Sequence, residues 1–368
     1  MATLSCISCT RSYPVDSPCW RCDCGSPLDL RMESCFPASA ITQRLPSLWR
    51  YREAMPLGEK STIISLGEGM TPMIEEDIDG LHLLVKLEYL SPSGSFKDRG
   101  ATVMVSKMRE LGITEAVEDS SGNAGSAIAL YCARAGIRPS IYVPASISAG
   151  KLAQIAASGA TIHRIEGTRE DVATAALAAA EQSYYASHNW NPFFFHGTKT
   201  FAFEVCEQLG WQAPDVVVSP VGNGTLLLGS FIGFGELQAV GMIHHLPILI
   251  GVQSEGCAPI HTAFETGLQD IPPIDRTPTI AEGIAIARPV RRRQILRAIR
   301  ETGGWTVAVT EQEILHALRT LCLRGCYVEP TAAVALAGAM KMNDDLRGKT
   351  VVVPLTGSGL KTGVQGHL

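Results

Sequence analysis

The sequence lacks a long apolar run, and this absence excludes an integral membrane protein. No stretch of the 368 residues reaches the ~20 apolar residues that a membrane-spanning helix needs. The first residues, MATLSCISCTRSYP, also lack the basic start and the apolar centre of a secretory signal peptide. We therefore expect no membrane association and a cytoplasmic location.

The sequence also lacks a strong excess of charge of either sign. The formal net charge is -5, and 18% of the residues are charged. Nucleic acids and anionic membrane surfaces attract basic proteins, so we expect neither as a partner. Internal repeats and low-complexity linkers are missing as well. With 46% hydrophobic residues, the chain has the composition of a globular protein long enough for two core-bearing units.

Cysteine, by contrast, is present and unevenly distributed. The chain has 11 cysteines, and most lie within the first 35 residues. The later ones stand mainly in apolar helical contexts, where we expect small buried hydrophobic side chains. These scattered residues are Cys132, Cys206, Cys257, Cys322 and Cys326.

The N-terminal cysteines form two short groups, CISC and CWRCDCG. Two such groups separated by about a dozen residues are typical of a tetrahedral zinc site. The predicted ligands are Cys6, Cys9, Cys22 and Cys24, although Cys19 in place of Cys24 would restore a second C-x-x-C pair. Four thiolates leave no open coordination position, so the zinc would be structural. The alternative is a ribbon with free thiols, in a segment too small to fold by apolar burial alone.

From residue 37 onward, short β-branched segments alternate with alanine-rich segments. This alternation predicts an α/β fold with mainly parallel sheets. The predicted strands are 137–145, 160–167, 214–222, 246–256, 304–310 and 349–357, and the predicted helices are 98–108, 149–159, 169–182 and 311–325.

Three glycine-rich turns, at residues 120–136, 219–235 and 354–363, stand where ligands bind in such folds, at the ends of strands and the starts of helices. In the second turn Gly222, Asn223, Gly224 and Thr225 open a helix. Free backbone amides, the helix dipole and a hydroxyl would together bind an anion such as phosphate. The alternative is that these glycines only let strand and helix pack closely.

Lys97 stands in an unusual collar of small residues, SPSGSFKDRG, at positions 91–100. Such a collar would let a flat ring approach the lysine. A lysine, a phosphate site and a partner for a ring nitrogen are the three things that pyridoxal phosphate requires of a protein. The sequence therefore predicts this cofactor, with a solvated lysine at a helix start as the alternative.

These motifs resemble those of threonine synthase and its relatives among the fold type II (β-family) pyridoxal-phosphate enzymes. The resemblance runs over nearly the whole chain. It implies two three-layer α/β domains, a large one of 37–86 with 185–368 and a small one of 87–184, plus a zinc ribbon-like segment at 1–36. The similar segments are SLGEGMTP, SPSGSFKDRG, SSGNAGSAIALYCARAGI, GVQSEGCAPI, TIAEGIAIARPV, GGWTVAVTEQEI, VEPTAAVALAG and VPLTGSGLK.

The resemblance implies a role for each matching residue. Lys97 would hold the cofactor covalently and serve as acid and base, Asn123 would bind the ring hydroxyl, and Thr356 would meet the ring nitrogen. The segment from Gly222 to Thr225 would bind the cofactor phosphate. A homodimer acting on a small amino-acid substrate is also implied. The substrate-binding residues would be Ser95, Ser121 and Lys199.

One position departs from the family pattern. Where threonine synthases have a segment like Asn-Pro-Tyr-Arg, residues 191–194 read NPFF, so Phe194 replaces the arginine expected to bind a substrate phosphate. A phenylalanine cannot make the paired contacts of a guanidinium, although His196 or Lys199 could take over. Three interpretations follow: a threonine synthase, an enzyme of elimination or replacement on another amino acid (cysteate synthase-like or dehydratase-like), and a cofactor-free binding protein. In the second interpretation Phe194→Arg should favour O-phosphohomoserine.

Overall fold

The computed structural model describes residues 2–361 except 146 and 148. Within this range the chain forms two compact units. The first unit consists of residues up to Met70 together with Lys97–Thr200, and the second of Thr71–Phe96 together with the residues from Phe201 onward. No helix among the described residues is long and apolar enough to cross a membrane. The domain boundaries implied by the resemblance stay a prediction.

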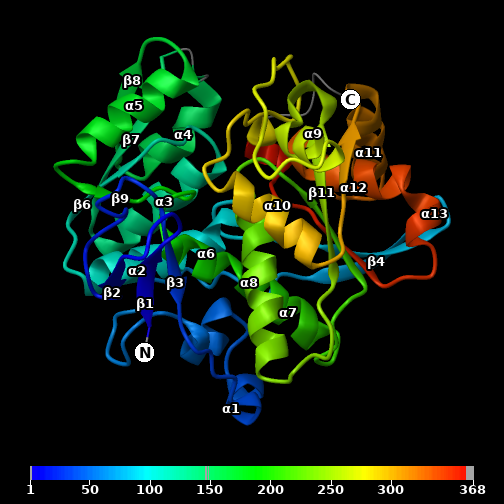
Figure 1. Cartoon of the computed structure of the whole chain (residues 1–368), viewed down its shortest axis with the longest axis horizontal. Coiled ribbons are helices and arrows are strands. Elements are labelled where there is room, and N and C mark those ends of the chain that lie inside the picture. The colour runs from blue at the N-terminus through cyan, green and yellow to red at the C-terminus, as the bar shows by residue number, and fades with distance from the viewer. Residues whose placement is uncertain (1, 146, 148, 362–368) are drawn as a thin grey trace. The chain divides into compact units, whose positions relative to one another are not determined.

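The first unit begins with a small antiparallel sheet in the order β2-β1-β3. This ribbon is not a separate appendage, because Leu4, Leu28 and Leu30 are buried in one apolar cluster with side chains of α2 and α3. Figure 1 shows its strands, in blue, beside α2. Its strands are β1 (Thr3–Cys6), β2 (Ser12–Pro14) and β3 (Leu28–Arg31).

The main sheet of the first unit has four parallel strands in the order β8-β7-β6-β9. Ile141 and Val143 of β7 pack against α3 and α4, whereas Tyr142 between them packs with α5. Since side chains alternate along a strand, helices cover both faces. The strands are β6 (Glu115–Glu118), β7 (Arg138–Pro144), β8 (Thr161–Ile165) and β9 (Tyr184–Tyr185). The helices of the unit are α1 (Ala38–Gln43), α2 (Lys97–Glu110), α3 (Asn123–Ala135), α4 (Ala149–Ala157), α5 (Arg169–Ala179) and α6 (Pro192–Thr198).

The second unit contains a six-stranded sheet in the order β12-β11-β10-β13-β5-β4. All its neighbours are parallel except the edge pair β4 and β5. Ile250 and Val252 of β11 share a core with α11 and α12, and a Cβ on Gly251 between them would contact Leu227 of α8 and Ile299 of α10. Helices therefore cover both faces here too. The strands are β4 (Met73–Ile78), β5 (Leu81–Lys86), β10 (Val216–Pro220), β11 (Ile248–Ser254), β12 (Thr306–Val309) and β13 (Val351–Pro354).

The helices of the second unit start at recognisable signals. In α11 Thr310 caps the first turn and Glu313 returns the hydrogen bond, a reciprocal capping box. Pro259 and Pro330 open α9 and α12, where the missing N–H is not needed. The helices are α7 (Thr200–Gln208), α8 (Thr225–Ala239), α9 (Pro259–Glu265), α10 (Arg292–Glu301), α11 (Glu311–Leu323), α12 (Pro330–Lys341) and α13 (Asn343–Leu346).

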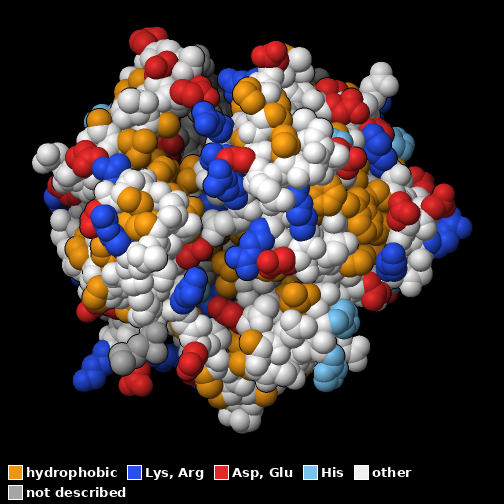
Figure 2. Space-filling model, viewed as in Figure 1, with side chains coloured by type: hydrophobic (Ala, Val, Ile, Leu, Met, Phe, Trp, Pro, Cys, Tyr) orange, Lys and Arg blue, Asp and Glu red, His pale blue; other side chains and the backbone are white. Residues whose placement is uncertain are grey.

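The predicted α/β class with mainly parallel sheets is confirmed, and both units have helices on two faces of a sheet. Each of the predicted strands and helices has a counterpart in the structure. Figure 2 shows acidic and basic side chains interspersed over the visible face, in line with the small net charge. Residues 362 and 363 of the third glycine-rich turn lie outside the described residues.

Candidate active site

Lys97 is the first residue of α2, and its side chain is half-buried. The two residues after it, Asp98 and Arg99, are fully buried. Asp98 stands in the first turn, where the helix dipole stabilises a carboxylate. Arg99 Nη1 donates a hydrogen bond to Thr200 Oγ1 at 3.0 Å. These buried neighbours hold the backbone from which the Lys97 side chain extends.

The small residues before Lys97 form a tight turn in the second unit. Gly94 has a φ of 81°, a left-handed conformation that favours glycine. Its carbonyl accepts a hydrogen bond from the Ser358 N–H at 2.9 Å, and the Phe96 N–H donates to the Thr356 carbonyl at 3.1 Å. The collar is therefore paired, backbone to backbone, with the segment that follows β13.

Two hydroxyl groups in this paired segment are buried and unsatisfied. Ser95 forms an antiparallel bridge with Gly357, next to Thr356. Neither Ser95 Oγ nor Thr356 Oγ1 has a hydrogen-bond partner among the described residues. An unsatisfied buried hydroxyl costs about 1–3 kcal/mol, so two neighbouring ones indicate a site for a polar ligand. A hydroxyl opposite a ring nitrogen is what the resemblance implies for Thr356, and its environment fits that role.

The predicted phosphate loop lies between β10 and α8. Gly224 precedes the helix with a φ of 70°, and Thr225 is the first helical residue. A Cβ on Gly222 would lie 2.9 Å from the Cα of Ile284, so any larger residue would push two backbones apart. The loop therefore presents backbone N–H groups and the positive end of α8, an arrangement suited to a phosphate.

The residues predicted in the second unit meet at one edge of the six-stranded sheet. Strands β5, β13 and β10 are consecutive parallel neighbours. Their carboxyl ends lead into the collar, the segment with Thr356, and the loop from Gly222 to Thr225, respectively. Since parallel strands end at the same edge, Ser95, Thr356 and the phosphate loop gather there.

Asn123 opens α3 in the first unit, directly after the loop that follows β6. Asn123 and Ser121 are both half-buried. Helix α3 packs against α2, the helix that begins with Lys97. The loop is held close to the helix, because a Cβ on Gly125 would lie only 1.8 Å from the Ser120 carbonyl oxygen. The glycine of the predicted asparagine loop is thus required by packing.

We expect Gly125→Ala to destabilise the first unit by about 1–3 kcal/mol, because the added methyl group forces helix and loop apart. Gly122→Ala is the matched control in the same loop. A Cβ there would approach only Ser120 Oγ, at 4.0 Å, and the φ of -106° suits alanine. Urea unfolding of both variants measures the difference, and equal stabilities would contradict this account.

Lys199 and Phe194 are fully buried in the first unit. These two residues bear on whether the chain can bind a substrate phosphate. Lys199 Nζ lies 2.9 Å from His196 Nδ1, and His196 Nε2 lies 3.1 Å from the Leu30 carbonyl oxygen in β3. Burial and the nearby Lys199 charge hold the pKa of His196 well below its usual value, so its ring is neutral. This chain of contacts joins α6 to the ribbon. A role of Lys199 in substrate binding stays a prediction.

Phe194 packs against the backbone of α2. A Cβ on Gly100 would lie 2.4 Å from its ring, and the ring also meets His188 edge-on at 6.0 Å between centroids. An arginine in this place would bury a guanidinium in an apolar cluster. Phe194→Arg would therefore disrupt the contact between α2 and α6, and it does not serve as the substrate test that the sequence suggested.

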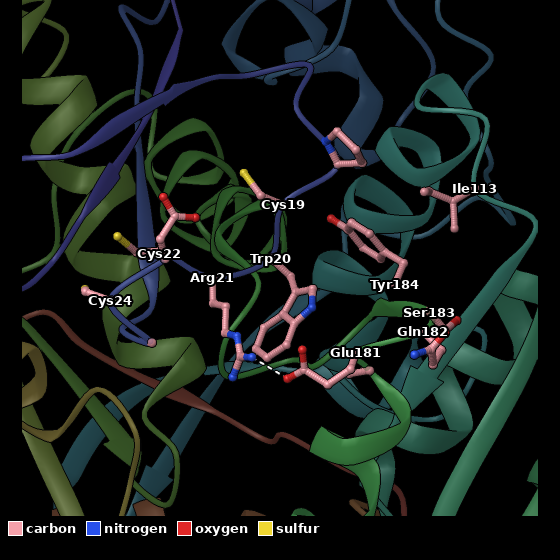
Figure 3. A pocket seen from close by; sticks show the side chains of 14 residues that line it. Cys19, Trp20, Arg21, Cys22, Cys24, Ile113, Glu181, Gln182, Ser183 and Tyr184 are labelled. Carbon is pink, nitrogen blue, oxygen red and sulfur yellow. Dashed lines mark hydrogen bonds and ion pairs between the residues drawn. The ribbon is translucent and has the colours of Figure 1, made fainter.

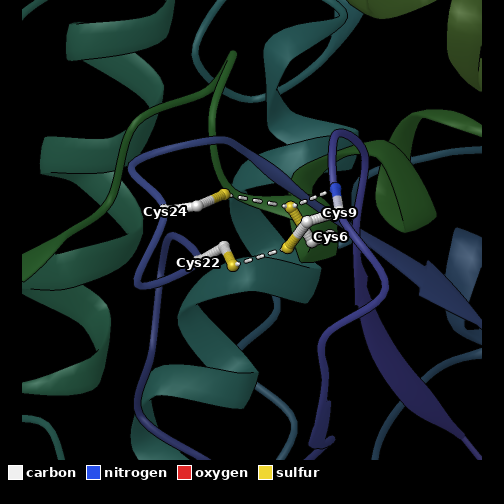
Figure 4. A group of neighbouring side chains, drawn as sticks. All are labelled: Cys6, Cys9, Cys22 and Cys24. Carbon is white, nitrogen blue, oxygen red and sulfur yellow. Dashed lines mark hydrogen bonds between the residues drawn. The ribbon is translucent and has the colours of Figure 1, made fainter.

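The four predicted zinc ligands converge in the ribbon. The sulfur atoms of Cys6, Cys9, Cys22 and Cys24 all lie within 4.8 Å of one another, and Figure 4 shows them pointing to a common centre. The Cys6–Cys24 and Cys9–Cys22 sulfur distances are 3.5 and 3.6 Å. Zinc bound at ~2.3 Å to four tetrahedral thiolates requires sulfur separations of about 3.8 Å, so the donor set fits the metal. Cys19 stands outside this group among the described residues.

A groove next to the ribbon was not predicted from the sequence. It has a volume of about 680 Å³ and is lined by residues 18–25 and 180–184 together with Ile113. Arg21 forms an ion pair with Glu181 across it, and its guanidinium lies 4.7 Å from the Trp20 ring (Figure 3). Its two walls are far apart in sequence and share no motif, so no sequence signal could have found it.

Comparison with known proteins adds three findings. The profile of a family described as "Pyridoxal-phosphate dependent enzyme" matches residues 64–357. A protein of Methanocaldococcus jannaschii named threonine synthase is 37% identical over 97% of this chain and 92% of its own length. A threonine synthase of Methanosarcina acetivorans is 36% identical over 98% of this chain and 92% of its own length.

The fold is also similar to that of solved structures. The crystal structure of a threonine deaminase from T.th. matches with a TM-score of 0.66 and 26% identity, over 78% of this chain and 92% of that one. The expected resemblance is therefore confirmed at the level of sequence and of fold.

Proposed function

Because this chain belongs to the family of pyridoxal-phosphate-dependent enzymes, we propose that it converts O-phosphohomoserine and water into threonine and phosphate. It is a pyridoxal-phosphate-dependent lyase of threonine synthase type. The observation that supports the proposal for the site is that the predicted phosphate loop and the segment with the unsatisfied Thr356 hydroxyl follow neighbouring parallel strands at one edge of the sheet. A cofactor-free binding protein would have no use for that combination.

Bound pyridoxal phosphate supplies an electron sink that lets a proton and then a leaving group depart from an amino acid. The residues of this chain do the remaining work. Lys97 Nζ would hold the cofactor, and it would take a proton from the substrate carbon and return it later in the cycle. Asn123 would bind the ring hydroxyl, and the N–H groups from Gly222 to Thr225 would bind the phosphate. The neutral Thr356 hydroxyl cannot hold a full positive charge on the ring nitrogen, which suits elimination and replacement chemistry.

A second candidate is elimination or replacement on another amino acid, as in a cysteate synthase or a dehydratase. One observation favours it: the arginine expected near the substrate phosphate is replaced by the buried Phe194. Losing one charge-assisted contact weakens binding of a phosphate by about 1.5–3 kcal/mol, or roughly ten- to a hundredfold. That loss is enough to shift a preference between substrates.

Phosphate and product formation from O-phosphohomoserine, O-phosphoserine and threonine, compared side by side, test the proposal. We expect threonine and phosphate from the first substrate, with a kcat/KM about tenfold or more above the others. Higher turnover of O-phosphoserine or threonine would select the second candidate. A colourless protein that takes up no cofactor would refute both.

We further propose that Cys6, Cys9, Cys22 and Cys24 hold one structural zinc ion. The convergence of their sulfur atoms supports this. The Tyr13 hydroxyl donates to Cys22 Sγ at 3.2 Å and lowers the pKa of that thiol to about 6, which favours the thiolate that binds metal.

We expect Cys9→Ser to lose the zinc, whereas Cys19→Ser should keep it, because Cys19 lies outside the group. Metal analysis of both proteins, prepared without chelator, gives the comparison. The ribbon shares its core with α2, so the loss should also lower the Tm of the first unit rather than only loosen the ribbon. Unmodified protein without zinc would refute this proposal.

We also propose the homodimer that the resemblance implies and the cytoplasmic location expected from the sequence, and light scattering of the purified protein tests the dimer.

A further inference from the structure

Glu68 is a buried carboxylate at the centre of the first unit. It belongs to the segment SLGEGMTP, and it is 1% exposed. Its neighbours Gly67, Gly69 and Met70 all have positive φ angles, of 83°, 90° and 46°. Glycine adopts such angles without strain, so only Met70 stands in a conformation that is costly for its residue type. The Glu68 side chain lies in the middle of this unusual backbone and ties it to its surroundings.

Both carboxylate oxygens have hydrogen-bond partners, and the single proton of the Thr102 hydroxyl is shared between Glu68 and the Ile64 carbonyl, which lies 2.6 Å from Thr102 Oγ1. Trp49 Nε1 lies 2.8 Å from Oε1, and Thr102 Oγ1 lies 2.7 Å from the same atom. Tyr131 OH donates to Oε2 at 2.8 Å, and the Leu66 N–H donates to it at 2.7 Å. Charge-assisted hydrogen bonds of this kind are about twice as strong as neutral ones, and a closed network is rigid.

Two of these donors come from the helices that carry predicted cofactor ligands. Thr102 lies on α2, little more than one turn after Lys97, and Tyr131 lies on α3, two turns after Asn123. A single carboxylate thus connects the helix that begins with the lysine to the helix that begins with the asparagine. A shift of either helix along its axis would carry its own hydroxyl away from this carboxylate.

We propose that Glu68 is a positioning residue, which sets α2 against α3 so that Lys97 and Asn123 are held in register for one ligand. The inference rests on the proposed function, because the alignment of Lys97 with Asn123 matters only if both residues bind one cofactor. Glu68 does not touch the cofactor in this role. It acts through Thr102 and Tyr131.

The network explains why the residue is glutamate. A glutamine would place an NH₂ group at one of the two oxygen positions. At Oε1 this group would face the Trp49 N–H, and at Oε2 it would face the Leu66 N–H. Neither N–H can accept a hydrogen bond. In each orientation of the glutamine amide, its NH₂ group would therefore face another buried N–H donor. A carboxylate accepts from Trp49, Leu66 and Tyr131 at once, and it also accepts from Thr102 when that hydroxyl does not donate to Ile64.

Tyr131→Phe tests the proposal with the smallest change, because it removes a single hydroxyl from the network. Tyr184→Phe is the matched control. Tyr184 is a buried tyrosine of the same unit whose hydroxyl accepts a hydrogen bond from Asn191 Nδ2 at 2.8 Å, away from Glu68. Glu68→Gln is the stronger variant of the test.

Backbone amide hydrogen exchange measures how firmly Glu68 holds α2 against α3, and it needs no measurement of activity. In Tyr131→Phe, exchange at the starts of α2 and α3 should quicken about tenfold, while in Tyr184→Phe it should not. With pyridoxal phosphate bound, kcat should fall roughly ten- to a hundredfold with a smaller change in KM, because the lysine is displaced rather than lost. The visible absorbance of the bound cofactor should shift in the same variant.

Two results would overturn the inference. One is Tyr131→Phe matching Tyr184→Phe in exchange, kcat and absorbance. The other is Glu68→Gln behaving like unmodified protein. If Glu68→Gln fails to fold, Tyr131→Phe decides. An unmodified protein that binds no cofactor would refute the proposed function instead, and the exchange comparison would then still decide whether Glu68 clamps the two helices.

Discussion

Lys97→Ala protein should fold normally and lose its activity by roughly 10³-fold or more. Lys97 is half-buried at the start of a helix, where alanine is readily accepted, so we expect little change in stability. The expected loss follows from the proposed mechanism, in which one amino group would both hold the cofactor and move the proton. The variant should also lack the visible absorbance that the lysine-bound cofactor gives.

Lys97→Arg separates charge from covalent attachment. A guanidinium keeps the positive charge but does not form the covalent link, so this variant should be as inactive as alanine. Lys60→Ala, a change at an exposed lysine outside the collar, should leave activity intact. Borohydride reduction followed by peptide mapping should label Lys97 in the unmodified protein. A label on another lysine would place the cofactor elsewhere and contradict the proposed site.

Lys86→Met should lower the free energy of unfolding of the second unit by about 3–5 kcal/mol. Lys86 Nζ lies 3.1 Å from Glu204 Oε2, and neither side chain is exposed. Removing the ammonium leaves a carboxylate buried without its cation. The Thr71 carbonyl also accepts a hydrogen bond from Lys86, but it keeps a second donor in Gln208 Nε2 at 3.0 Å. The substitution therefore mainly deprives Glu204 of its partner Lys86.

The double variant Lys86→Met, Glu204→Leu is the informative control. With both charges gone, no unpaired ion remains, and much of the lost stability should return. Thermal unfolding should give a Tm about 6–20 °C below that of unmodified protein for Lys86→Met, and a smaller drop for the pair. A double variant less stable than Lys86→Met would show that the pair itself, rather than the orphaned charge, dominates.

Local order along the chain was predictable because it depends on neighbours in sequence. The strand at 214–222 and the helix that opens after Gly224 could be predicted from β-branched residues followed by glycine and threonine. The cysteine spacing likewise pointed to Cys6, Cys9 and Cys22 and left Cys24 or Cys19 as the fourth member, and the structure gathers Cys24 with the other three. Strands with weaker patterns, such as the two residues of β9, gave no usable signal.

Contacts between distant segments could not be predicted. The bridge between Ser95 and Gly357 depends on how the strands are ordered, which one sequence does not reveal. The same holds for Glu68, which the sequence placed in a family segment without indicating its contacts with Thr102 and Tyr131. Nor could a motif alignment tell that Phe194 faces the core.

The packing of the ribbon has a consequence for synthesis of the chain. Leu4, Leu28 and Leu30 bury their side chains against α2, and Leu30 also bonds to His196. Translation completes α2 at residue 110 roughly 80 residues after residue 31, a delay of about 4–16 s at 5–20 residues per second. During that interval the three leucines lack this helix as a partner, and His196 follows later still. Zinc captured by the nascent ribbon would hold its strands together over this wait, so metal supply would set the yield of native protein before it could affect the finished enzyme.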